Sequence, residues 1–234
     1  MFPLMFLPDS TWLLLIPALL FTLWAQGRVK SAYEKFSRVR ARSGITGAEV
    51  ARNLLAKAGL GNITVQMGQG ELTDHYDPRR GVIRLSPAVY QGSSLAALGI
   101  AAHEAGHAIQ HGERYFPLAF RNSFFPVANL GSQLAMPLFF IGFIFSLQGL
   151  STIFMDLGIL LFAFTVVFHL ITLPVEFNAS RRAVALLEGG SYISGDEVRG
   201  ARQVLSAAAL TYVASAAVAL LHLLRLILLR GRRD

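Results

Sequence analysis

The sequence predicts a mainly α-helical membrane protein, with about four transmembrane helices and a small cytoplasmic part of mixed α and β structure. Of its 234 residues, 53% are hydrophobic and 15% are charged, whereas soluble proteins carry about 25% charged residues. Four stretches contain no Asp, Glu, Lys or Arg, and each approaches or exceeds the roughly 20 residues that a helix needs to cross a bilayer. These stretches are residues 10–27, 122–155, 157–175 and 203–224.

The positive charge follows the predicted topology. The net charge is +7, but 13 of the 21 Lys and Arg residues lie between Arg28 and Arg121, and residues 122–180 contain none. Loops rich in Lys and Arg stay in the cytoplasm, so the basic cluster that begins at Arg28 places this segment inside. The charge therefore follows membrane topology and argues against a nucleic-acid partner. We expect an integral protein of a prokaryotic cytoplasmic membrane.

The chain divides into five segments on this basis. The first apolar segment is followed, not preceded, by basic residues, which is the reverse of a secretory signal and predicts a retained anchor. The last apolar segment, near 207–229, either spans the membrane or stops at its surface. Spanning would place Arg230 outside, which opposes the preference of basic residues for the cytoplasmic side. The predicted segments are an anchor (1–27), a cytoplasmic catalytic part (28–121), a transmembrane hairpin (122–174), cytoplasmic helices (175–206) and a carboxy-terminal hydrophobic helix (207–234).

Capping signals and alternating apolar residues predict the elements of the cytoplasmic part. Capping boxes at Thr46–Glu49 and Ser194–Glu197 each open a helix, and a further helix follows from about Ser94 to His111. Strands are expected at 63–66, 72–77 and 82–85, with a short helix after Ser86-Pro87, and the hairpin turns in a tight connection at 149–152.

The chemistry is concentrated in one helix, which contains the HExxH sequence His103-Glu-Ala-Gly-His107. Residues four apart lie one turn apart on one helix face, so both imidazoles can bind one cation, and the chain has no cysteine to offer instead. This pattern predicts a site for one Zn²⁺ with Glu104 as general base, and Gly106 leaves room for a third ligand or substrate. The alternative is a chance string whose side chains face water, but unpaired burial in this Ala-rich helix would be costly.

Glu176 is the candidate third ligand. Two predicted spans separate it from His107, and an even number of crossings returns the chain to the same side of the membrane. The alternative is a solvated acid that favours a helix start through the helix dipole.

The motifs together resemble a known family. HEAGH, followed after a hairpin by EFNASRRA, is similar to the HtpX and CAAX-prenyl-protease pattern. TGAEVARNLL, LTDHYDPR, VANLGSQLA and LSAAALTYVA resemble the YugP-like family of membrane zinc metallopeptidases, from Gly44 onward. The resemblance implies a zincin-like catalytic unit, with His103, His107 and Glu176 as zinc ligands and Glu104 as catalytic base. The HtpX-type Asp is Ser180 here, so Ser180 or Asn178 is expected to orient a ligand histidine.

Other polar residues have weaker signals. His75, Tyr76 or Arg181 could donate to a developing oxyanion, or could be a turn-stabilising cluster and a flanking charge. Residues 82–85 are expected to form an edge strand that holds an extended peptide. His111 lies about 12 Å from His103 by helical rise, too far to share its metal, and is expected on the surface.

These observations predict a membrane-embedded zinc endopeptidase that cuts membrane-associated proteins at the cytoplasmic boundary of the bilayer. The main alternative is a scaffold or assembly factor in which zinc only staples helices together. It would need a closed site with four protein ligands, and the sequence offers no obvious fourth. A transporter would carry ionisable groups along its spans, where only His169 and Asp156 qualify.

Overall fold

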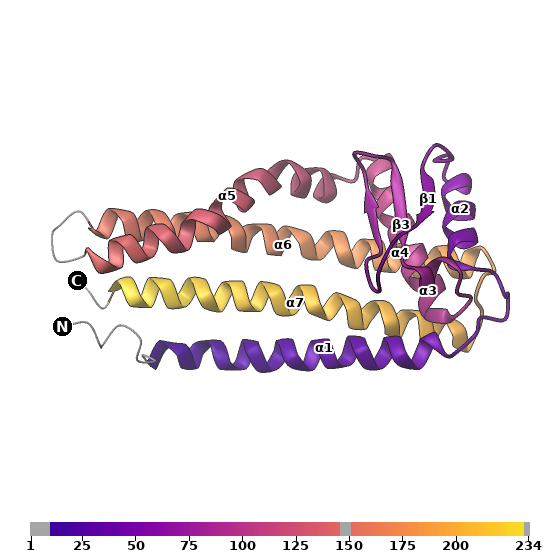
Figure 1. Ribbon diagram of the computed structural model, residues 1–234, viewed down its shortest axis with the longest axis horizontal. Coiled ribbons are helices and arrows are strands. Elements are labelled where there is room, and N and C mark those ends of the chain that lie inside the picture. The colour runs from indigo at the N-terminus through magenta and orange to yellow at the C-terminus, as the bar shows by residue number, and fades with distance from the viewer. Residues whose placement is uncertain (1–9, 146–150, 232–234) are drawn as a thin grey trace. The chain divides into compact units, whose positions relative to one another are not determined.

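The computed structural model describes residues 10–145 and 151–231, which form two compact units (Figure 1). The helical unit comprises the described residues of Met1–Trp24, Phe120–Leu173 and Thr211–Asp234. The mixed unit comprises Ala25–Ala119 and Pro174–Leu210. Four long helices contribute residues to both units: α1 (Leu15–Ser37), α5 (Phe116–Ile144), α6 (Ser151–Gly189) and α7 (Asp196–Gly231).

Most of the apolar residues of these four helices lie in the helical unit. Within the described residues, four helices are long and apolar enough to cross a membrane, the number that the sequence predicts. The last predicted segment belongs to the continuous helix α7, which is one of the four. A short 3₁₀ helix, η1 (Ser10–Leu14), precedes α1. The predicted 149–152 connection falls largely on residues 146–150, outside the described residues.

Close approach of α5 and α6 depends on glycine. A Cβ atom added at Gly131 would lie 2.5 Å from the carbonyl oxygen of Leu161, and one at Gly158 would lie 2.7 Å from that of Ala135. Small residues allow helix backbones to meet in this way in membranes, where packing replaces the hydrophobic effect as the source of association.

In the mixed unit, α2 (Gly47–Lys57) begins at the predicted capping box. The Thr46 hydroxyl accepts from the Glu49 backbone N–H, and the Glu49 carboxylate accepts from the Thr46 backbone N–H at 2.8 Å. Of the two hydrogen bonds of the second predicted box, the structure shows only the one accepted by Glu197. Helix α7 begins at Asp196, after Gly195, whose φ is +56°. Glu197 still accepts from the backbone N–H of Ser194 at 3.1 Å.

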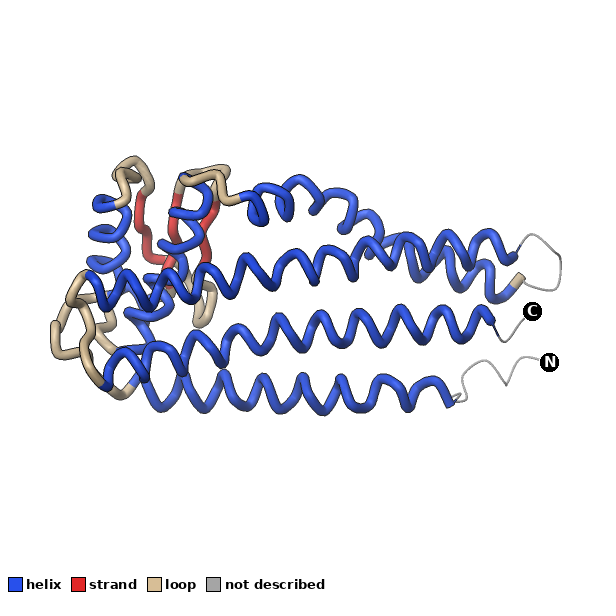
Figure 2. Tube along the Cα trace, turned by 180° about the vertical axis from the view of Figure 1, so that it is seen from behind, coloured by secondary structure: helices blue, strands red, loops and turns tan. Residues whose placement is uncertain are grey.

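A three-stranded sheet lies beside α2 and α4 (Leu95–Gly112), as Figure 2 shows. Its strands are β1 (Thr64–Met67), β2 (His75–Asp77) and β3 (Val82–Leu85), in the order β1-β3-β2. The expectation that residues 82–85 form an edge strand is wrong. β3 pairs with parallel β1 on one side and antiparallel β2 on the other, so its apolar residues are the buried centre of the sheet.

One hydrophobic core joins the sheet to the helices of the mixed unit. It contains Leu54 and Leu55 from α2, Ile83 from β3, Leu98 from α4 and Leu187 from the end of α6. The short helix α3 (Pro87–Tyr90) contributes Val89. This core fixes α4 against the carboxy-terminal part of α6, and the candidate site lies between those two segments.

Candidate metal centre

Helix α4 presents the two histidines of the HExxH sequence. The Ser94 side chain caps the helix by accepting from the Ala97 backbone N–H at 3.2 Å, and an Ala-rich sequence propagates it. The His103 and His107 rings lie with centroids 4.6 Å apart and an interplanar angle of 82°. One turn of helix thus brings both imidazoles to the same face, as the spacing predicts.

Glu176 reaches this pair from α6. Its Oε2 lies 3.3 Å from Nε2 of His103 and 3.4 Å from Nε2 of His107, and the residue is 3% exposed. Gly106 makes the approach possible, because a Cβ there would lie 3.1 Å from the carbonyl oxygen of Ala179. The space expected at Gly106 therefore accommodates the backbone of the helix that carries Glu176.

The three side chains fit a tetrahedral cation. The three ligand atoms all lie within 4.8 Å of one another, and no other group of three or more His, Cys, Asp or Glu residues in the described chain meets that test. Zinc about 2.0–2.1 Å from each of two ligands at the tetrahedral angle places them about 3.3–3.4 Å apart. The separations of Glu176 from the two imidazole nitrogens match this value.

A buried glutamine sets the orientation of His107. The Gln110 amide nitrogen donates to the Val175 carbonyl and to Oδ1 of Asn178, both at 2.9 Å, and the residue is fully buried. Its oxygen is therefore turned to Nδ1 of His107, 3.0 Å away. An amide oxygen only accepts, so Nδ1 of His107 is the donor in this contact, and Nε2 is the ring nitrogen that faces Glu176.

The same network extends to the surface. Oδ1 of Asn178 also accepts from Nε of Arg182 at 2.7 Å, and Arg182 pairs with Glu113 at 2.6 Å. On the other side of the site, Oγ of Ser180 lies 3.3 Å from Nδ1 of His103. Ser180 thus contacts a candidate ligand histidine directly, whereas Asn178 reaches one only through Gln110.

Glu104 directly follows His103 in the HExxH sequence. It is 8% exposed, and in the described part of the chain its carboxylate makes no hydrogen bond or ion pair. Burial lowers the pKa of His107, but the nearby Glu176 and Glu104 carboxylates outweigh it and raise that pKa overall. The two carboxylates therefore favour positive charge at His107.

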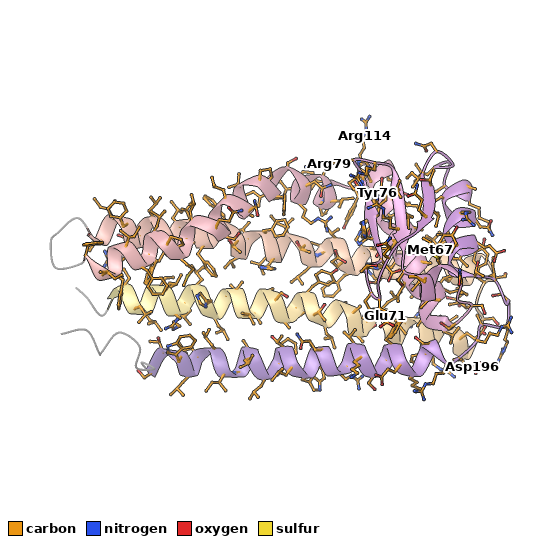
Figure 3. All side chains as sticks on the ribbon, in the orientation of Figure 1. Met67, Glu71, Tyr76, Arg79, Arg114 and Asp196 are labelled. Carbon is orange, nitrogen blue, oxygen red and sulfur yellow. The ribbon has the colours of Figure 1, made fainter. Side chains whose placement is uncertain are left out.

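The other sequence candidates make local contacts. Nδ1 of His75 lies 2.7 Å from the Thr73 carbonyl oxygen, and Arg181 donates to the Phe177 carbonyl at 3.3 Å. Tyr76 lies on the sheet beside α4 (Figure 3), where its hydroxyl is 3.0 Å from Nδ1 of His111 and burial raises its pKa. Their predicted role as oxyanion donors stays a prediction.

The nearby acidic residues stabilise turns, as the alternative interpretation of this segment expects. Asp77 accepts from the backbone N–H groups of Arg79 and Arg80, and Asp74 accepts from the backbone N–H of Ser86. His111 is exposed, as predicted.

Sequence reasoning missed Gln110. A polar residue at His107+3 on an otherwise apolar helix lies on the same face as the histidine, and this spacing is the signal that could have found it. Its partners are 65 and 68 residues away, so the contact itself is a product of the tertiary structure.

The sequence is similar to those of known proteins. Residues 11–231 match the family described as "putative neutral zinc metallopeptidase". The chain is 52% identical over 223 residues to the "putative membrane protease YugP" of Bacillus subtilis (strain 168), covering 94% of this chain and 97% of the relative. No solved structure matches it.

Proposed function

The chain belongs to this neutral zinc metallopeptidase family, and we propose that it is an endopeptidase that hydrolyses peptide bonds of membrane-associated proteins with one zinc ion per chain. The observation that carries the proposal is the convergence of His103, His107 and Glu176 within 4.8 Å, with the Glu176 carboxylate at tetrahedral spacing from both imidazole nitrogens. Four apolar helices and the membrane protease relative support the membrane setting.

His103, His107 and Glu176 would hold the zinc ion in this proposal. Bound there, zinc supplies a Lewis acid for the scissile carbonyl and lowers the pKa of a bound water to about 7. Glu104, adjacent to His103 in the chain, takes the proton of the attacking water and later passes it to the leaving amine. Gln110 and Ser180 hold the two imidazoles through their Nδ1 atoms, so that both Nε2 atoms face the cation.

The number of protein ligands favours catalysis over a purely structural metal. Structural zinc sites are closed by four protein ligands, whereas catalytic sites keep one position for water. Among the described residues, only three His, Cys, Asp or Glu side chains make up the group. The scaffold alternative is therefore the weaker explanation.

The charge distribution and the sheet indicate where a substrate would bind. The basic segment from Arg28 to Arg121 supports a site at the cytoplasmic boundary of the membrane, because loops rich in Lys and Arg stay in the cytoplasm. An extended peptide would pair with β2, an edge strand of the described sheet that packs against α4.

The direct test is Glu104→Gln in the full chain, purified in detergent. Zinc content, measured by elemental analysis, should stay near that of the wild type because Glu104 is not a ligand. Cleavage of casein or a membrane peptide should fall at least about 100-fold, the typical contribution of general-base catalysis. A chelator should abolish the wild-type activity.

The matched control is Glu188→Gln, an exposed glutamate near the end of α6 that should change neither zinc content nor cleavage. Unchanged cleavage by a zinc-loaded Glu104→Gln protein would overturn the proposed mechanism.

A further inference from the structure

A basic groove lies in the mixed unit, apart from the metal centre. It runs between Ala25–Ser37 of α1 and Asp196–Leu210 of α7, which lie side by side in opposite directions (Figure 1). Its volume is about 490 Å³. The groove is lined by four basic residues and no acidic one: Arg28, Lys35, Arg199 and Arg202.

Helix packing forms this groove. Phe36, which is 7% exposed, belongs to the hydrophobic core and also lines the groove. A Cβ atom at Gly200 would lie 2.9 Å from the Phe36 ring and 2.8 Å from Cδ1 of Leu95. The missing side chain at Gly200 therefore lets α7 approach α1 closely, which fixes Arg199 and Arg202 relative to the basic residues of α1.

In the described part of the chain, none of the four basic side chains of the groove makes an ion pair or a hydrogen bond to an acidic group. Elsewhere in the same unit, Arg42 pairs with Asp196 and Arg182 pairs with Glu113. Four uncompensated like charges around one groove repel one another, and a bound anion would relieve that repulsion.

The flanking sequence indicates which anion the groove fits. Arg28 directly follows the charge-free residues 10–27, and Arg202 directly precedes the charge-free residues 203–224. The groove thus lies where one charge-free stretch ends and another begins, the level of lipid headgroups for helices that cross a membrane. Its lining also offers neutral hydrogen-bond donors for phosphate oxygens, which are Ser31, Gln203 and Ser206. Phe36, Ala207 and Leu210 add apolar surface for the lipid glycerol and upper acyl chain.

We propose that this groove binds the phosphate-bearing headgroup of an acidic phospholipid. Basic residues attract anionic lipid through charge, and the groove adds hydrogen bonds and apolar contacts that a bare basic flank lacks. The site is independent of the metal centre, so a failure of one proposal does not affect the other.

The test measures lipid binding to the full chain in detergent by native mass spectrometry. Phosphatidylglycerol and phosphatidylcholine are titrated separately, and the wild type should retain phosphatidylglycerol with clear preference. The double variant Lys35→Gln with Arg199→Gln should weaken that preference about thirtyfold. This factor follows from the usual contribution of one basic residue to the binding of anionic lipid, taken twice. Lys35→Arg with Arg199→Lys should keep it.

The matched control is Arg79→Gln with Arg114→Gln, which removes the same charge from the sheet end of the mixed unit (Figure 3). This variant should keep the preference. Equal retention of both lipids by the wild type, or an unchanged preference in the Lys35 and Arg199 variant, would overturn the proposal. Displacement of phosphatidylglycerol by equimolar inorganic phosphate would also overturn it, because the groove would then be a site for free phosphate.

Discussion

The helical unit and the mixed unit differ in what surrounds their polar residues. In the helical unit, polar side chains join helices that are distant in sequence: Arg225 donates to Thr11 at 3.1 Å and lies over the Trp12 ring, and Arg230 pairs with Asp156 at 2.9 Å. Large apolar side chains such as Leu160 are exposed there. In the mixed unit, buried polar residues from α4 and α6 connect into one network that ends at three potential metal ligands.

The difference follows from what surrounds each unit. Residues that face lipid need only be apolar, and a few polar contacts suffice to hold the helices together. A buried polar group in the mixed unit must find a partner, since leaving it unsatisfied costs about 1–3 kcal/mol. The network around Gln110 meets that requirement and at the same time aims two imidazoles at one point. Substitutions in this network or at the three candidate ligands should therefore affect zinc binding, and substitutions in the helical unit should leave it unchanged.

The largest effect is expected from Glu176→Ala. Two imidazoles alone hold zinc weakly, so zinc per protein, measured by elemental analysis, should fall together with proteolysis. Glu188→Ala, an exposed glutamate on the same helix, is the control and should leave both unchanged. Full zinc occupancy in Glu176→Ala would show that the third ligand lies elsewhere, with Asp77 and His75 the next candidates.

A smaller loss is expected from Gln110→Ala. The change removes the partner that keeps the proton on Nδ1 of His107, and loss of such partners typically lowers metal affinity about 10–100-fold. Competition with a chelator of known affinity measures the change. Gln91→Ala, which removes an exposed glutamine, is the control. Wild-type zinc affinity in Gln110→Ala would contradict the role assigned to this contact.

Gly106→Ala should have a still smaller effect on zinc affinity. The new Cβ, 3.1 Å from the Ala179 carbonyl oxygen, should push α6 and its Glu176 slightly away from α4. Gly99→Ala on the same helix is the control, because its nearest neighbour would be 3.9 Å away. That control should gain up to about 1 kcal/mol of helix stability. Equal zinc affinity in the two variants would show that close approach at Gly106 does not matter.

The smallest effect is expected in the helical unit. Asp156→Asn removes the ion pair with Arg230, whose side chains are 53% and 29% exposed. Such pairs contribute about 0–1 kcal/mol. Thermal unfolding should shift little, and zinc content and proteolysis should match the wild type. A loss of zinc in this variant would break the contrast between the two units.

Several features followed from local sequence. The charge-free stretches predicted four helices of membrane-spanning length, because length and apolarity suffice for that inference. The Thr46–Glu49 box predicted the start of α2, and the four-residue spacing placed His103 and His107 on one face. Each depends on residues within a turn or within one helix, where periodicity is enough.

Other features were decided only by the tertiary structure. Pairing on both sides made β3 the central strand, since nothing in residues 82–85 specifies which strands will flank it. The partners of Gln110 on α6 come from the packing of two helices that are distant in sequence. The number of crossings and a family resemblance named Glu176 as the third ligand, but its distances to the histidines depend on the same packing, which the absence of a side chain at Gly106 allows. Contacts between distant segments depend on how surfaces fit together, and the local pattern of a sequence does not contain that information.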